Sequence, residues 1–401
     1  MVYDDIVIGS GLTSLATILG LPKGRKICVL AGLDTPHIQY YDSVSCIPSS
    51  NLGRYGLGSY WHGVIPTCDL NAIGPLDINS YSSLFNYFYP GELINDRVNC
   101  PWIFIPFQPI RPSNYWRRIR QEKYEDLNFL KVLATSIHED SRGWRVTTSE
   151  GFVFYGSRVW IGAGALGTSK ILLNSPQFSG SVRGTASDHL IIYLGQLDRQ
   201  KYPNQTAPVV SRGRRGVWLK SIYDEVNQAL ITTKPAYFDY KQLDRGIEQR
   251  NAFGLPASGV VGKLFNSRSP GLLFEAAFNK WGFFPNSSKL NVYAQIRVKD
   301  GYVIDFDKNQ LHPIQGNIEN RISQLHSNLE WPELNKTKRK DLFIRGIHLH
   351  RTVNRKGCLD FELNKMYPTF SIVDSSIIEN IGPEHHTFKT MVHAYMQAKK
   401  S

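Results

Sequence analysis

Four histidines near the end of the chain are the side chains best suited to acid–base chemistry. His348 and His350 alternate in a strand-like run, and His385 and His386 precede a helical pattern that extends from Thr387 to Lys399. A neutral imidazole can accept a hydroxyl proton near neutral pH, and a helix N-terminus stabilises negative charge that develops beside it. The same spacing also fits hydrogen-bonded histidines on one face of a strand and a helix start without chemistry.

A second candidate for chemistry is the glycine turn that follows the apolar run Ile6–Ile8. Gly9 to Ser14 form a Gly-x-Gly-x-x-Ser turn that leads into a helix-period pattern. In dinucleotide-binding folds, such a turn places the pyrophosphate at the N-terminus of the helix that follows the strand. Gly9 allows the tight turn, Gly11 lets the backbone approach the phosphates, and Ser14 is small enough for close packing of helix against strand.

The element that should complete this unit is a second parallel strand, predicted at Lys26–Leu30. An acidic residue normally ends that strand and binds the ribose hydroxyls. This chain has Ala31 and Gly32 there, and Asp34 follows a few residues later. Residues other than Ala31 must therefore bind an adenosine ribose.

Two further glycine-rich segments bracket a predicted β-meander. Residues 51–63 permit close approach to a flat or phosphorylated ligand and equally fit a surface loop. Residues 158–173 read as strand, glycine turn and helix. Between these segments, alternating apolar residues predict strands at Phe129–Leu133, Trp144–Thr148 and Phe152–Phe154. Two glycine turns around a meander fit a flavin-binding fold better than a nicotinamide-binding one.

The composition is typical of a globular protein, and its positive net charge favours anionic partners. The formal net charge is +12, and basic runs occur at residues 117–120, 212–215 and 336–340. No nucleic-acid motif accompanies these runs, so we interpret them as solvated faces and expect no nucleic-acid partner. The five cysteines never form a Cys-x-x-Cys pair, which favours a reduced, cytoplasmic protein without a zinc site. Neither a secretory signal nor a transmembrane run is found.

In its order of segments the sequence resembles the glucose-methanol-choline (GMC) family of FAD-dependent alcohol oxidoreductases, with pyranose and cholesterol oxidases nearest. The likeness begins at the Gly9 turn and continues through the loop Gly56–Gly63 and the turn Ile161–Thr168, which is similar to that family's second signature. It extends to the steps Asp188-His189 and Val373–Ser376.

The resemblance implies FAD as cofactor and an α/β fold, α+β overall. A Rossmann-like FAD-binding domain with a β-meander would comprise residues 1–79, 126–185 and 341–401. A substrate-binding domain containing a second sheet would comprise residues 80–125 and 186–340, where strand-like runs occur at 190–194 and 290–294. Two domains also suit a chain of 401 residues, which exceeds the ~250–300 at which one core stops growing.

The resemblance also implies the site residues. His348 would be the catalytic base and His385 the second hydrogen-bonding group, followed by Thr352 and Thr387 respectively as the family's pattern requires. We assign low weight to catalysis by His350, His386 and His62. The residues implied at the cofactor are Gly9, Gly11, Leu12, Thr13, Ser14, Gly58, Ser59, Val132, Gly162, Gly164, Asp374, His386 and Thr387. No metal ligands are expected, because no acidic residue is spaced to complete a histidine site.

The sequence departs from the family's pattern at three positions. Arg351 stands where a glycine is usual, His386 where a proline is usual, and Ala31 where the ribose-binding acid belongs.

The expected reaction is oxidation of an alcohol to a carbonyl by hydride transfer to flavin N5. The basic balance suggests a sugar, a glycan or another bulky, anionic or carrier-linked alcohol, and it leaves peripheral membrane contact open. Two alternatives remain: a flavin-fold protein of different chemistry, such as a reductase or isomerase, and a non-catalytic scaffold that has lost FAD. Visible absorption separates the scaffold from the enzymes.

Overall fold

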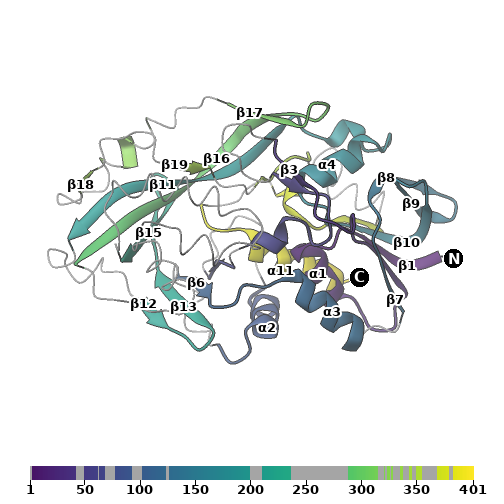
Figure 1. Ribbon diagram of the computed structural model, residues 1–401, viewed down its shortest axis with the longest axis horizontal. Helices are drawn as coiled ribbons and strands as arrows, with labels where there is room; N and C mark the ends of the chain where they lie inside the picture. The colour runs from purple at the N-terminus through teal and green to yellow at the C-terminus, as the bar shows by residue number, and fades with distance from the viewer. Residues whose placement is uncertain are drawn as a thin grey trace.

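A computed structural model gives the fold of the protein. The residues it describes are 2–41, 49–61, 63–67, 77–92, 102–122, 126–198, 210–235, 288–314, 320, 323–325, 327, 335–336, 343–345, 349–354, 368–378 and 383–401. Figure 1 shows a parallel sheet near the N-terminus and a long antiparallel sheet toward the other end of the molecule.

The parallel sheet has the strand order β7-β2-β1-β10. Its strands are β1 (Val2–Ile8), β2 (Ile27–Leu30), β7 (Leu127–Leu130) and β10 (Val153–Ile161), and β20 (Phe370–Ile372) pairs with the second half of β10. Helix α1 (Leu12–Gly20) connects β1 to β2, so the predicted βαβ unit is confirmed. Because β1 also pairs directly with β10, the glycine turns after these two strands emerge side by side.

Both faces of this sheet are buried, as parallel strands require. Alternate side chains of β1 and β2 point to opposite faces. Val7 and Val29 pack in one core with α1 and with α11 (Thr387–Lys399), whereas Ile8 and Leu30 pack in a second core under the meander. The helix predicted from Thr387 to Lys399 is thus confirmed, and its apolar face explains its position against α1.

The meander is present, but its first strand is not the predicted one. It consists of β8 (Ala134–Asp140), β9 (Gly143–Thr148) and β10, paired antiparallel. The strand predicted at Phe129–Leu133 is wrong as a meander strand, because Leu127–Leu130 forms β7 and pairs parallel with β2. Alternation alone cannot distinguish an edge strand of a parallel sheet from a meander strand. Residues 131–133 join β7 to β8 without the glycine or proline that would have indicated a break.

Two helices between residues 77 and 122 also belong to the core around α1. They are α2 (Ile78–Phe88), capped by the Asp77 carboxylate, and α3 (Pro112–Glu122). Phe85 of α2 packs edge-on against Phe388 of α11, and Trp116 of α3 donates its indole N–H to the carbonyl of Ser10 at 2.8 Å. Helix α3 therefore supports the first glycine turn directly, and α2 packs against α11.

The antiparallel sheet has the order β14-β15-β16-β11-β18. Its long central strands, β11 (Thr185–Asp198) and β16 (Lys289–Asp305), contain the two strand-like runs predicted from the sequence and pair with Ile192 opposite Ala294. The flanking strands are β14 (Ile222–Asp224), β15 (Ala229–Pro235), β17 (Gln310–Pro313), β18 (Asn335–Lys336) and β19 (Phe343–Arg345).

Smaller elements complete the described fold. One sheet joins β5 (Ile65–Pro66), β6 (Trp102–Pro106), β12 (Val210–Arg212) and β13 (Gly216–Lys220), and β3 (Ile38–Gln39) pairs with β4 (Ser50–Asn51). The short helices are η1 (Gly56–Tyr60), η3 (Ser179–Ser181) and η5 (Ser375–Ile377), and α4 (Ala165–Leu173) follows β10. Among the described helices, none combines the length and apolar character needed to cross a membrane.

Candidate functional site

The first glycine turn is fixed by contacts with both of its neighbours. Gly9 adopts φ +96°, and its N–H donates to the carbonyl of Leu30 at 2.8 Å. The Ser10 hydroxyl donates to the carbonyl of Ala31 at 2.8 Å and accepts the N–H of Tyr55 at 2.8 Å. The turn is therefore tied to the end of β2 and to the loop that precedes η1.

The N-terminus of α1 is left open for an anion. Gly11 is the N-cap, no side chain caps the helix, and its first turn has no acidic residue. A Cβ built on Gly11 would meet only the carbonyl oxygen of Tyr55, at 3.8 Å. The first N–H groups of a helix without a side-chain cap attract phosphate. Space and backbone donors at Gly11 thus fit the pyrophosphate of a dinucleotide.

The second glycine turn lies directly against the first. A Cβ at Gly9 would come within 2.4 Å of the carbonyl oxygen of Gly162, and a Cβ at Gly162 would come within 2.5 Å of the Ser14 hydroxyl and 3.1 Å of the Thr13 hydroxyl. Ser14 is fully buried there. The predicted packing role of Ser14 is therefore confirmed, and its partner is the second turn.

Asp374 organises the second turn. One carboxylate oxygen accepts the N–H of Gly164, the N-cap of α4, at 2.9 Å and the Thr168 hydroxyl at 2.5 Å. The other accepts the N–H and the hydroxyl of Ser376, at 3.0 and 2.6 Å. Burial outweighs these bonds and raises the pKa of Asp374. The carboxylate thus holds the turn in shape, and cofactor contact by Asp374 stays a prediction.

The loop at η1 packs over the start of α1. A Cβ at Gly58 would come within 3.0 Å of the Leu12 side chain, so this glycine allows close approach. The carbonyls of Ser59 and Trp61 accept hydrogen bonds from the Arg111 guanidinium at 2.9 and 2.7 Å, and burial lowers the pKa of Arg111. Gly58 and Leu12 therefore lie beside the predicted phosphate position. His62 lies outside the described residues.

Val132, one of the residues that the resemblance implies at the cofactor, lies just beyond β7 in the link to β8. Its carbonyl accepts the N–H of Gly32 at 3.1 Å, next to the bond between Ala31 N–H and the Leu130 carbonyl. Val132 is therefore at the carboxyl end of β2, where this type of fold places the adenosine.

The predicted catalytic histidines are placed only in part. His348 lies outside the described residues, and His385 is half-buried immediately before α11. His386 is buried and is the N-cap of α11, where its carbonyl accepts the N–H and the hydroxyl of Thr390 at 2.9 and 3.0 Å. Thr387 is the first residue of the helix, as predicted.

Three buried histidines form a cluster that sequence reasoning missed. The rings of His189, His350 and His386 have centroids 5.3 to 5.7 Å apart. His189 lies on β11, and His350 pairs with Ser187 of the same strand through hydrogen bonds of 2.9 and 3.1 Å. A polar cluster thus lies where β11 meets the N-terminus of α11.

The start of α11 also carries a buried ion pair. The Lys389 ammonium contacts the Glu384 carboxylate at 2.6 Å, and both side chains are inaccessible to solvent. A lysine in the first helical turn opposes the helix dipole, so Glu384 compensates an otherwise unfavourable charge.

One negative finding concerns metal binding. Across the residues that the structure describes, no group of three or more His, Cys, Asp or Glu side chains is arranged to hold a metal ion, and this includes the histidine cluster.

Arg351, where the GMC pattern has a glycine, adopts φ +60°, which explains the usual preference for glycine at that position.

Comparison with known proteins places the fold. No protein family profile matches the sequence, and no curated protein matches it. The structure of pyridoxine 4-oxidase from Mesorbium loti matches with a TM-score of 0.54 at 10% identity and covers 99% of each chain. A fungal aryl-alcohol oxidase matches with a TM-score of 0.51 at 9% identity, over 99% of this chain and 98% of that one. The chain therefore has the fold of the GMC oxidoreductases over its whole length, as the resemblance implied.

Proposed function

We propose that this protein binds FAD and oxidises an alcohol to a carbonyl. The observation that carries the proposal is the pair of glycine turns in direct contact, Gly9 against Gly162, within a fold shared end to end with two oxidases. When bound, FAD would supply the acceptor for the hydride that leaves the alcohol carbon. The remaining chemistry belongs to side chains of this protein.

The residues that would hold FAD fall into three groups. The N-terminus of α1 at Gly11 binds the pyrophosphate, and Val132 contacts the adenine. The second glycine turn, shaped by Asp374, and the η1 loop with Gly58 and Ser59 enclose the middle of the dinucleotide. His386 and Thr387, at the start of α11, face the flavin, where the positive end of the helix stabilises negative charge on the reduced ring.

For proton transfer we propose His348 as the base that removes the hydroxyl proton and His385 as the second group that hydrogen-bonds the substrate oxygen. An imidazole within ~2.6–3.2 Å of a hydroxyl can do this at neutral pH. Support comes from the position of His385 at the start of α11, next to the buried ring of His386.

The domain division follows from the same proposal. Residues 1–79, 126–185 and 341–401 would bind FAD, and residues 80–125 and 186–340 would shape the substrate site. Pyridoxine 4-oxidase and aryl-alcohol oxidase are named for alcohol substrates, which supports a CH–OH donor here. The net charge of +12 favours an anionic, bulky or carrier-linked alcohol such as a sugar or glycan.

Flavin spectroscopy of the purified protein tests the proposal. The protein should show oxidised flavin absorption or take up added FAD, and a suitable alcohol should bleach it without oxygen. The variants His348→Asn and His385→Asn should keep the flavin and lose the bleaching, whereas the exposed His138→Asn should behave as wild type. A colourless protein that takes up no FAD contradicts the proposal. Equal reduction by the alcohol in all variants would overturn the roles proposed for His348 and His385. A bound flavin that no alcohol reduces would instead indicate a reductase or an isomerase.

A further inference from the structure

The end of β2 raises the question of how this chain holds the adenosine ribose without an acid at Ala31. We infer that Asp34 accepts the ribose hydroxyls in place of that acid, and that Arg54 and Lys131 position its carboxylate. This inference rests on the proposed binding of FAD and identifies residues that the sequence resemblance does not assign.

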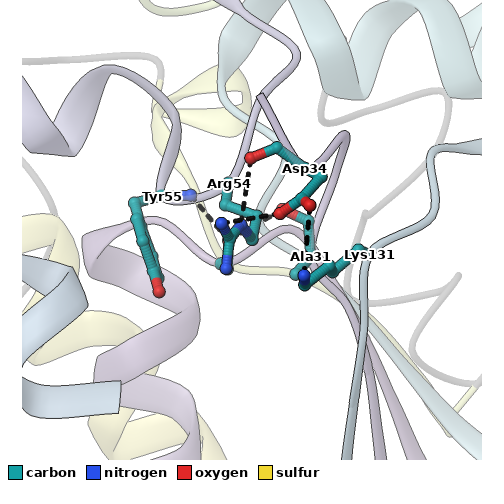
Figure 2. Close-up of polar contacts among 6 residues, drawn as sticks. Ala31, Asp34, Arg54, Tyr55 and Lys131 are labelled. Carbon is teal, nitrogen blue, oxygen red and sulfur yellow. Dashed lines mark hydrogen bonds and ion pairs between the residues drawn. The ribbon is translucent and has the colours of Figure 1, made fainter. Parts of the chain in front are cut away.

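The three side chains form one ion-pair cluster (Figure 2). The Asp34 carboxylate contacts the Arg54 guanidinium through Oδ1 at 2.6 Å and the Lys131 ammonium through Oδ2 at 3.1 Å. Arg54 Nε also donates to the backbone carbonyl of Asp34 at 3.2 Å. Each carboxylate oxygen contacts one cation and has a lone pair left for a hydroxyl donor. The pairing therefore fixes the acceptor without using all of its capacity.

The backbone places this cluster at the adenosine end of the dinucleotide site. Leu33 donates its N–H to the carbonyl of Leu52, and Arg54 donates its N–H to the carbonyl of Leu33, both at 2.9 Å. These bonds bring Arg54 beside Asp34, directly after the end of β2. Lys131 comes from the other side, because it precedes Val132 at the end of β7. The Asp34 carboxylate therefore lies at this position, although Asp34 follows Ala31 by three residues.

A purely structural role explains the cluster poorly. The side chains of Asp34, Arg54 and Lys131 are 54%, 30% and 51% exposed. Exposed ion pairs contribute little to stability because water screens them and the long side chains lose entropy. Three charged side chains that converge at the carboxyl ends of parallel strands, where such folds bind ligands, are better explained by ligand binding.

The main competing explanation is recognition of a phosphate on the ribose. The cluster carries one negative and two positive charges, and an arginine in this region can accommodate a ribose phosphate. The two explanations predict opposite signs for removal of the Asp34 charge. If Asp34 binds hydroxyls, its loss weakens binding of an unphosphorylated adenosine. If the cations bind a phosphate, loss of the Asp34 charge removes a competing anion and strengthens binding of an adenosine phosphorylated on the ribose.

The experiment uses full-length protein from which the flavin has been removed, titrated with FAD and followed by flavin fluorescence. Asp34→Asn should raise the Kd for FAD about tenfold to a hundredfold, the range for lost hydrogen bonds to a charged acceptor. Arg54→Gln and Lys131→Gln should raise it less. Binding of FMN, which lacks the adenosine, should not change. ADP should compete better than 2′-deoxy-ADP against the wild type but not against Asp34→Asn.

Matched controls come from the turn between β16 and β17. Asp307→Asn and Lys308→Gln remove exposed charges there and should leave FAD binding unchanged. An unchanged or lower Kd in Asp34→Asn overturns the inference while the FAD proposal stands, and tighter binding of NADP⁺ than of FAD would assign the cluster to phosphate. If wild-type protein binds neither FAD nor ADP, the proposed function fails and the inference fails with it.

Discussion

Alanine substitutions at the two glycines of the first turn should have different consequences, one for protein stability and the other for ligand binding. Gly9 has φ +96°, and a Cβ there would lie 2.4 Å from the backbone oxygen of Gly162. Gly11 has φ −71° and ψ −168°, which alanine adopts without strain, and a Cβ there would lie in the open space beside Tyr55. Gly9→Ala therefore damages the fold, whereas Gly11→Ala damages the ligand site.

The magnitudes follow from these contacts. For Gly9→Ala, the left-handed backbone costs about 1–3 kcal/mol, and relief of the overlap with a backbone atom costs about 1–3 kcal/mol more. For Gly11→Ala, the unfolding free energy should fall by only about 0.5–1 kcal/mol, the difference between glycine and alanine at an N-cap. Its methyl group, however, occupies the space in which a pyrophosphate would approach the helix, so FAD affinity should fall at least about tenfold.

Thermal melting of the flavin-free variants and FAD titration measure the two effects separately. Gly180→Ala is the control, since a Cβ there has no neighbour within 4 Å. We expect Gly9→Ala to melt well below wild type, and Gly11→Ala to melt near wild type but bind FAD poorly. Undiminished FAD binding by Gly11→Ala would refute the assignment of the α1 N-terminus as the phosphate site.

Three further predictions concern buried charges. Asp374→Asn should lower the unfolding free energy by about 1–3 kcal/mol, because an amide must turn its NH₂ toward the N–H of either Gly164 or Ser376, and denaturant melts of this variant measure the loss. Because burial raises the Asp374 pKa, the stability linked to this carboxyl is complete below the unfolded pKa and is lost as pH rises through the folded pKa. The difference in melting temperature between wild type and Asp374→Asn should therefore narrow as the pH rises above about 4, the ordinary pKa of an aspartate, and a difference that widens would contradict this sign. Lys389→Met should cost about 3–5 kcal/mol by leaving the Glu384 charge buried and unpaired, and the added change Glu384→Gln should recover most of it, whereas equal stability of the single and double variants would argue against a coupled pair.

Local patterns predicted the two glycine turns that we propose bind phosphate and the helix that packs against the first of their helices. The turn at Gly9, the turn at Gly162 and the helix from Thr387 each carry their signal within about fifteen residues, through glycine spacing or helical periodicity. The pairing of β7 with β2 could not be predicted in this way, because it depends on contacts across 100 residues of chain.

The histidine cluster escaped prediction for the same reason. His189 and His350 are 161 positions apart, and the pairing of Ser187 with His350 brings them together beside His386. The Asp34 cluster was within reach, since the sequence already showed an acid shortly after Ala31. The missing information was the pairing of Leu33 with residues 52–54, which brings Arg54 to it.

We propose that the two adjacent glycine turns bind FAD for the oxidation of an alcohol. The most direct measurement is the visible spectrum of the purified full-length protein, recorded with added FAD and then with candidate alcohols in the absence of oxygen. We expect bound oxidised flavin that an alcohol reduces in wild type and in His138→Asn but not in His385→Asn. A protein that binds no flavin would contradict it.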